Sequence, residues 1–205
     1  MSFDKSVFIN CPFDSTYNAM MHSMIFTVVL LGYKPRLALE CSDAGRARLE
    51  KIIDIIKESR ISIHDLSKLK SENKDEFARM NMPFELGLDF GCRKYSDNNA
   101  LIRKKFLILG GERYEYMKAL SDLSGIDIQY HKYEEEKLIK SIRDWFVINE
   151  RLTNILSPVQ IWNRFMDFNF YYYETLLAKG YSKDQLYDLP INEQIEYMII
   201  FLSDK

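Results

Sequence analysis

The feature of this sequence that most constrains its fold is an alternation of short apolar runs with longer segments of helical periodicity. The apolar runs have the length of buried strands, and the segments between them repeat apolar residues every three or four positions. Strands that alternate with helices in this way form a parallel sheet covered on both faces. The predicted strands are residues 7–9, 36–39, 61–66, 105–109 and 126–128.

Five such strands predict an α/β fold, a flavodoxin-like three-layer domain with the strand order 2-1-3-4-5. In this order the winding reverses between strands 1 and 3, and ligands bind there, outside the carboxyl ends of the strands. The loops at that point are residues 10–14 and 65–85. We therefore expect the functional residues in these two segments.

Local signals predict where the helices begin and end. Residues 14–15 could cap a helix whose apolar face runs over residues 20–29, and Gly32 could end it. Residues 42–43 could cap a second helix. The remaining predictions are a loop over residues 67–75 and helices from about Pro83 and over about residues 134–146.

The composition changes near residue 150, which divides the chain into a predicted α/β domain (1–150) and a helical C-terminal extension (151–205). Ser157 and Pro158 form a strong helix start, and a very aromatic segment follows them. Residues 182–185 form a second cap, of the capping-box type. These helices carry too many apolar residues to lie in water, so they pack on the α/β domain or mediate homo-oligomer contacts.

Charge and hydropathy exclude several classes of partner. The 28 basic and 30 acidic residues leave a net charge of −2, so we expect no nucleic acid and no membrane as partner. The short basic cluster at residues 103–105 is predicted to be a solvated approach to a strand. No apolar run reaches the roughly 18 residues that span a bilayer, and the first residues lack a signal-peptide pattern. We therefore expect a cytoplasmic location.

No cofactor motif is present. The three cysteines and three histidines lack metal-ligand spacing, so no metal site is expected. Neither G-x-G-x-x-G nor G-x-x-x-x-G-K-[ST] occurs, which argues against a dinucleotide-binding dehydrogenase and a P-loop NTPase. Cys11 with His22 or His64 would make a thiol nucleophile pair, but no spacing supports it.

Glu85 is the residue that most directly suggests chemistry. Pro83 would lie in the first turn of a helix, which places Glu85 near the N-terminus, where free N–H groups and the helix dipole stabilise an ionised carboxylate. Such a carboxylate can stabilise a ribosyl oxocarbenium ion or attack it. Stabilisation of the helix start alone is the alternative. Gly87 and Gly91 indicate a close approach of the helix to the sheet or to a ligand.

Other residues of the two loops could complete a binding site. Asp65 and Ser67 follow strand 3, where Asp65 could bind ribose hydroxyls, act as a second acid–base group or simply cap the turn. Phe13 could stack on a base or pack in the core. The candidate phosphate ligands near strand 2, unless they form a solvated surface, are Arg36, Arg46 and Arg48.

Three segments together resemble a known superfamily. Residues 7–14 read VFINCPFD, residues 63–67 read IHDLS and residues 82–87 read MPFELG. They resemble bacterial TIR-like proteins and the related nucleoside 2-deoxyribosyltransferases, over about residues 5–148. In both groups a glutamate followed by Leu-Gly or a similar pair is catalytic, and that position corresponds to Glu85. Asn10 stands where the TIR pattern usually has serine.

This resemblance implies a function. TIR enzymes cleave NAD at the nicotinamide–ribose bond. Some bacterial members act in antiphage defence, as in Thoeris systems, where the product signals to a downstream effector protein. The chain is therefore expected to take NAD or a related nucleotide as substrate, with no cofactor and with Glu85 as the catalytic residue. The expected substrate-binding residues are Phe8, Asn10, Cys11, Pro12, Phe13, Asp14, Arg36, Asp65, Ser67, Met82 and Phe84.

Two other functions remain open. An enzyme like the nucleoside 2-deoxyribosyltransferases releases its base as an anion unless a general acid protonates it, whereas nicotinamide leaves NAD as a neutral molecule. The candidates for that acid are Asp14, Asp65 and Asp89. The other possibility is a nucleotide-sensing or TIR-type interaction module without catalysis.

Overall fold

The structure is a computed structural model that describes residues 2–70, 78, 80–182, 185–186 and 189–203. Its centre is a five-stranded, all-parallel sheet with the order β2-β1-β3-β4-β5. The strands are β1 (Ser6–Asn10), β2 (Lys34–Arg36), β3 (Ile61–Asp65), β4 (Lys105–Gly110) and β5 (Ile128–Tyr130). The predicted fold class and strand order are confirmed.

Two strands lie at positions that differ from the prediction. β2 is over by Arg36, and residues 38–40 form a 3-10 turn instead. Pro35 lies inside β2, opposite Val7, and is tolerated because β2 is an edge strand. β5 begins two residues later than predicted because Ile126 still belongs to the preceding turn, where its N–H donates to the Leu123 carbonyl oxygen.

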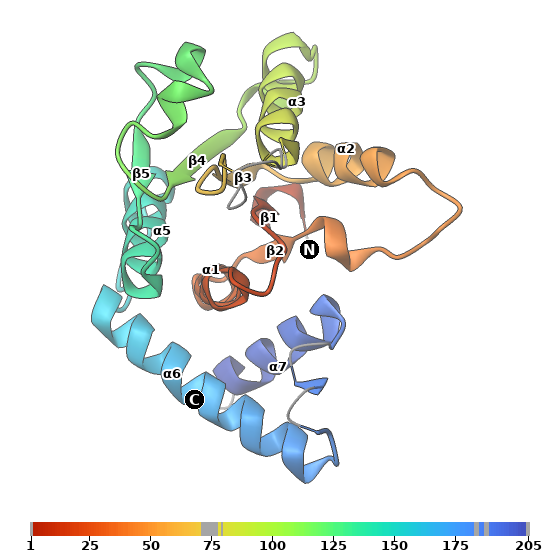
Figure 1. Cartoon of the computed structure of the whole chain (residues 1–205), viewed down its shortest axis with the longest axis vertical. Helices are drawn as coiled ribbons and strands as arrows, with labels where there is room; N and C mark the ends of the chain where they lie inside the picture. The colour runs from red at the N-terminus through yellow and green to blue at the C-terminus, as the bar shows by residue number, and fades with distance from the viewer. Residues whose placement is uncertain (1, 71–77, 79, 183–184, 187–188, 204–205) are drawn as a thin grey trace.

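Helices cover both faces of the sheet, which gives the predicted three layers (Figure 1). α1 and α5 pack together on one face, and α2 and α3 lie on the other. The helices are α1 (Asn18–Leu30), α2 (Arg48–Glu58), α3 (Asn81–Tyr95), α4 (Asn99–Ile102), α5 (Glu135–Glu150), α6 (Pro158–Ala178) and α7 (Ile191–Ser203). In the described parts of the chain, no helix is long and apolar enough to cross a membrane.

α1 and α2 begin later than predicted because neither has a capping side chain, and α3 begins two residues earlier than predicted, at Asn81. Asp14 instead accepts a hydrogen bond from the Thr16 N–H (3.1 Å), and α1 begins only at Asn18. Asp43 closes a similar turn before α2. Gly32 does end α1 as predicted, with a φ of +80° that favours glycine.

The C-terminal helices share the main hydrophobic core with the α/β domain. The ring of Phe26 on α1 lies 5.4 Å from that of Phe168 on α6 and 6.4 Å from that of Phe201 on α7. Ser157 caps α6 in a complete capping box, with Pro158 in the first turn, as predicted. Packing within one chain therefore buries the inner faces of these helices. Residues 71–75 of the predicted loop and 183–184 of the second predicted cap lie outside the described residues.

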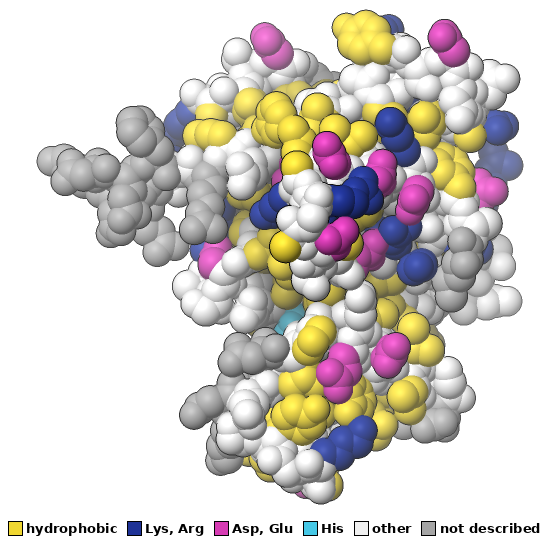
Figure 2. All heavy atoms as spheres, turned by 90° about the vertical axis from the view of Figure 1, so that its right-hand side faces the viewer, with side chains coloured by type: hydrophobic (Ala, Val, Ile, Leu, Met, Phe, Trp, Pro, Cys, Tyr) yellow, Lys and Arg dark blue, Asp and Glu magenta, His cyan; other side chains and the backbone are white. Residues whose placement is uncertain are grey.

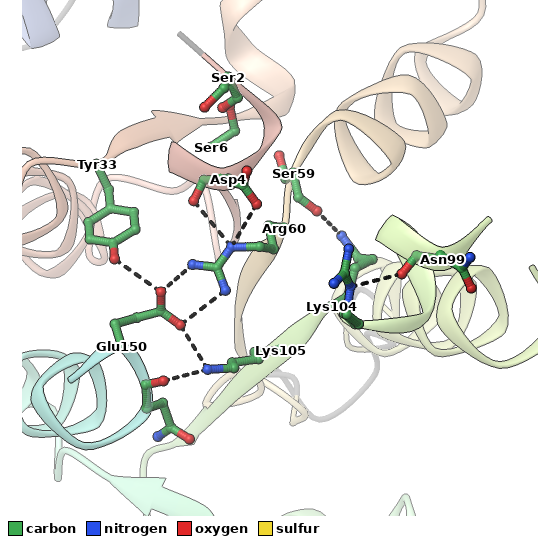
Figure 3. Close-up of polar contacts among 12 residues, drawn as sticks. Ser2, Asp4, Ser6, Tyr33, Ser59, Arg60, Asn99, Lys104, Lys105 and Glu150 are labelled. Carbon is green, nitrogen blue, oxygen red and sulfur yellow. Dashed lines mark hydrogen bonds and ion pairs between the residues drawn. The ribbon is translucent and has the colours of Figure 1, made fainter.

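An ion-pair network holds the end of α5 against the amino ends of the strands (Figure 3). The Glu150 carboxylate accepts hydrogen bonds from Tyr33 (3.1 Å), Lys105 (3.1 Å) and Arg60. Burial opposes ionisation of Glu150, but the hydrogen bonds from Arg60 and Lys105 outweigh it and lower the pKa. This network lies at the end of the sheet opposite the predicted site, so we assign it to structure.

Lys104 corrects the prediction of a solvated basic cluster. Its side chain is fully buried, and its ammonium donates to the carbonyl oxygens of Ile56 (2.7 Å) and Ser59 (Figure 3). The ammonium also lies 3.3 Å from Oδ1 of Asp89 on α3. Burial lowers the pKa of Lys104, and Asp89 opposes that shift.

Candidate active site at the carboxyl edge of the sheet

The carboxyl ends of β1 and β3 meet at one edge of the sheet, where Asn10 is paired with His64. Nδ2 of Asn10 donates to the Met82 carbonyl oxygen (2.9 Å), which joins the end of β1 to the first turn of α3. The two predicted loops therefore meet where the strand order reverses. A ligand site at that point has walls from β1, β3 and α3.

Glu85 is a nearly buried carboxylate in this wall, with 5% of its surface exposed. Its nearest charge is Nη2 of Arg48, 4.0 Å from Oε1, and it accepts no hydrogen bond from any described residue. Neither carboxylate oxygen of Glu85 is among the fully buried side-chain atoms that lack a hydrogen-bond partner. Both oxygens therefore keep some contact with solvent. A carboxylate in this setting is accessible and poorly compensated.

Burial raises the pKa of Glu85 to about 7, and the charge of Arg48 opposes this only in part. The expectation that the helix N-terminus stabilises the ionised form of Glu85 is therefore wrong. α3 begins at Asn81, two residues before Pro83, so Glu85 is past the first turn and its free N–H groups. A carboxyl group with a pKa near neutrality suits proton transfer and is typical of functional sites.

The two glycines of α3 do not mark a close approach to the sheet. A Cβ atom at Gly87 would meet nothing within 4 Å, and one at Gly91 would meet only Tyr95, at 3.9 Å. The interpretation as tight packing is wrong, and the structure gives no packing reason for either glycine.

Cys11, in the loop after β1, is under the electrostatic influence of three carboxylates from different elements. The pKa of Cys11 is raised well above its usual value by burial and then by the charges of Asp65, Glu85 and Asp14. The thiolate is thus disfavoured, which argues against a Cys11 nucleophile. The charges of Asp14, Asp65 and Glu85 therefore all act on the same thiol.

Pro12 and Phe13 lie behind the site, on the side of the core. Pro12 is buried, and Phe13 packs against the main core. Of the two alternatives for Phe13, packing in the core is therefore the one observed. Asp14 accepts a hydrogen bond from Lys68 (2.8 Å), which holds the loop after β1 to the end of β3. Burial opposes ionisation of Asp14, but the Lys68 and Thr16 hydrogen bonds lower the pKa.

Asp65 is fully buried, and protein donors surround its oxygens. It accepts hydrogen bonds from the Tyr17 hydroxyl (2.5 Å), His131 Nε2 (3.0 Å) and the Ser67 N–H (2.8 Å). Burial opposes ionisation, but the hydrogen bond and charge of His131 lead the contacts that lower the pKa. Asp65 therefore caps the turn after β3 and anchors the site, as the third alternative predicted.

Sequence reasoning missed Tyr17, His131 and Tyr133. The hydroxyl of Tyr133 donates to the Ser67 carbonyl oxygen (3.0 Å), and the Tyr133 N–H donates to Nδ1 of His131. His131 follows β5, at the same edge of the sheet as Asp65. The sequence signal that could have identified His131 as a site residue is its position at the end of a strand.

Three predicted binding residues need comment. Phe8 is fully buried among Ile52, Ile55 and Ile56, so it belongs to the core and not to the site. Met82 contributes its backbone oxygen, and its side chain packs in a core cluster. Phe84 is 55% exposed.

Arg36 has no free positive charge to offer to a phosphate, in contrast to the prediction. It forms ion pairs with Glu40 (2.6 Å) and Glu58 (3.0 Å), so its charge is already compensated. Arg46 is paired with Asp54. Arg48, with its side chain half exposed and next to Glu85, is the arginine of the three that the structure brings to the site.

Among the described residues, no group of three or more His, Cys, Asp or Glu side chains could hold a metal ion. Three cavities lie elsewhere: about 980 Å³ between α1, β2, α6 and α7, about 320 Å³ between α1, α6 and α7, and about 900 Å³ beside β5. None of these three cavities is lined by a predicted site residue. In Figure 2 the surface narrows between the α/β part and the C-terminal helices.

Comparison of the chain with models of known families, with curated proteins and with solved structures gives no match. Support for a function from the structure therefore comes from the geometry of the site.

Proposed function

We propose that this protein is an N-glycosidase that cleaves the nicotinamide–ribose bond of NAD, with Glu85 as the catalytic residue. The observation that carries the proposal is a nearly buried carboxylate at the reversal point of the sheet, which accepts no hydrogen bond from a described residue and has Arg48 4.0 Å away. Buried carboxylates without donors cost stability and are retained where they do chemistry.

The positive nicotinamide ring of NAD suits this carboxylate. A cation beside Glu85 lowers its pKa, so substrate binding favours the ionised form. When the bond between ribose C1′ and the ring nitrogen breaks, its electron pair neutralises the ring and a cation develops at C1′. The Glu85 carboxylate stabilises that cation or bonds to it, and water then adds to C1′ with loss of one proton.

The aspartates favour NAD over a nucleoside. Release of a purine or pyrimidine needs a general acid, and Asp14, Asp65 and Asp89 were the candidates. Hydrogen bonds and charges overcome burial at each of the three and lower the pKa, so all three are ionised at neutral pH. Nicotinamide needs no proton to leave. Arg48, beside Glu85, is our candidate for contact with the pyrophosphate.

The wider setting follows the resemblance and belongs to the same proposal. We place the protein in the cytoplasm, as an antiphage-type signalling enzyme whose ADP-ribose-type product acts on an effector protein. Homo-oligomers would form through the outer faces of the C-terminal helices, where Val159, Met166 and Phe170 are exposed.

The test is incubation of the purified chain with NAD, with nicotinamide and the second product identified by mass spectrometry. We expect turnover by the unmodified protein and none by Glu85→Gln. Glu136→Gln, at an exposed position on α5, is the matched control and should retain activity. A second product with one water added indicates hydrolysis, and one without water indicates cyclisation. NAD that binds and stays intact at high protein concentration would instead identify a sensing module.

A further inference from the structure

A chain of buried polar side chains runs from the site into the sheet. Asn10 Nδ2 lies 2.9 Å from the Met82 carbonyl oxygen and 3.0 Å from His64 Nδ1. Nε2 of His64 lies 3.2 Å from Oδ2 of Asp89, whose Oδ1 lies 3.3 Å from Nζ of Lys104. All of these side chains are buried, at 2% exposure or less for the residue.

The chemistry of these atoms allows one arrangement of protons. A carbonyl oxygen can only accept, so the nitrogen of the Asn10 amide must face Met82. The second proton of that nitrogen points to Nδ1 of His64, which therefore accepts. His64 then carries its proton on Nε2 and donates it to Asp89. Burial opposes ionisation of Asp89, but His64 and then Lys104 outweigh it and lower the pKa.

This arrangement leaves the Oδ1 atom of Asn10 for another purpose. Both amide protons are used, and no described residue donates to Oδ1. Oδ1 is also not one of the fully buried side-chain atoms that lack a partner, so it keeps a small exposed area even though only 1% of Asn10 is exposed. Met82 precedes Glu85 by three residues, which places both on one side of α3. An oriented acceptor therefore lies about one helical turn from Glu85.

We propose that Asn10 Oδ1 accepts a hydrogen bond from the substrate, beside the bond that Glu85 cleaves, and that His64 and Asp89 are positioning residues that fix the orientation of this amide. The inference rests on the proposed function and adds a recognition element to it. Two donors of NAD lie next to the scissile bond: the carboxamide N–H of nicotinamide and the hydroxyls of the ribose. An acceptor at this place recognises either.

Calorimetric binding of NAD to Glu85→Gln, which should not cleave it, separates recognition from catalysis. Adding Asn10→Ala should weaken binding about tenfold, as expected for loss of one well-placed hydrogen bond. Nicotinic acid adenine dinucleotide lacks the carboxamide donor. If Asn10→Ala does not weaken binding of this analogue, the carboxamide is the donor; if it weakens both ligands alike, the ribose is.

The positioning role has its own pair of variants. His64→Phe removes the acceptor for Asn10, whereas His64→Asn keeps an oxygen that can accept. We expect His64→Phe to weaken NAD binding as much as Asn10→Ala does, no further loss when both are combined, and partial retention by His64→Asn. Thermal unfolding of each variant shows that it is folded.

The outcomes separate this inference from the proposed function. If folded Asn10→Ala binds NAD as tightly as its Glu85→Gln parent, the inference is wrong even if the unmodified protein cleaves NAD. If binding depends on Asn10 but the unmodified protein leaves NAD intact, the recognition stands and the glycosidase does not. Absence of any NAD binding by the parent overturns both.

Discussion

Replacement of Glu85 by glutamine should stabilise the folded protein at alkaline pH. Glutamine has the same shape without the charge, so it removes the unfavourable ionisation of a carboxyl group that has no donor among the described residues. Burial raises the pKa of Glu85 from its usual 4.5 to about 7. At roughly 1.4 kcal/mol per pH unit this shift corresponds to at most about 3.5 kcal/mol, and solvent contact of the oxygens reduces it to about 2.

The sign follows from proton binding. The folded protein holds the Glu85 proton up to about pH 7, whereas the unfolded chain releases it above about pH 4.5. The stabilisation that the protonated Glu85 side chain gives, relative to the ionised side chain, is therefore complete below pH 4.5 and is lost as the pH rises to 7. Above pH 7 the unmodified protein carries the full cost of the buried charge, and Glu85→Gln does not.

The measurement is urea unfolding of the unmodified protein and Glu85→Gln at pH 5 and at pH 8. We expect Glu85→Gln to gain about 2 kcal/mol over the unmodified protein between the two pH values, because all other groups titrate equally in both. Glu136→Gln should show no such gain. An equal difference between Glu85→Gln and the unmodified protein at both pH values would refute the raised pKa and with it the basis of the proposed chemistry.

Further predictions concern single sites. The kcat/KM for NAD should rise with pH to a plateau with a midpoint near 7, set by Glu85; a fall above pH 7 would mean that the protonated form acts. Gly87→Ala should stabilise the protein by about 1 kcal/mol in thermal unfolding, since nothing lies within 4 Å of the added methyl group. Lys104→Met should cost about 3–5 kcal/mol in urea unfolding because it removes one partner of a buried ion pair. Phe168→Ala should cost about 3–5 kcal/mol if the C-terminal helices belong to the main core, and much less if they unfold separately.

The sheet was predictable because its signal is periodic. β1, β3 and β4 are built around apolar runs that alternate with helices, and the handedness of the crossovers leaves few orders for five strands. The edge strand β2 (Lys-Pro-Arg) has no apolar run, and its position was predicted wrongly. The helix starts were less predictable because the polar residues before α1 and α2 close turns of their own. A side chain that can cap a helix can equally cap a turn, and the sequence does not distinguish the two.

The position of the site could be predicted from the sequence, but the pKa shifts of its residues could not. The carboxyl ends of β1 and β3 placed Asn10, Asp65 and Glu85 together from the strand order alone. The burial that raises the pKa of Glu85 and the hydrogen bonds that lower that of Asp65 depend on distant segments. Tyr17 and His131 approach Asp65 from 48 and 66 residues away, and no local pattern encodes such contacts.

Glu85 and Asp89 lie one turn apart on the same helix, yet their pKa values move in opposite directions. Both are buried, so desolvation acts on both; His64 and Lys104 compensate Asp89, while Glu85 has Arg48 at 4.0 Å. Carboxyl groups whose environments separate their pKa values commonly divide the work of a site. A compensated charge stabilises the fold, and its loss should unfold the protein. An uncompensated charge destabilises the fold, and its loss should stabilise the protein and abolish its chemistry. Opposite effects of Asp89→Asn and Glu85→Gln on stability, together with loss of NAD cleavage by Glu85→Gln, would therefore assign anchoring to the first carboxylate and catalysis to the second.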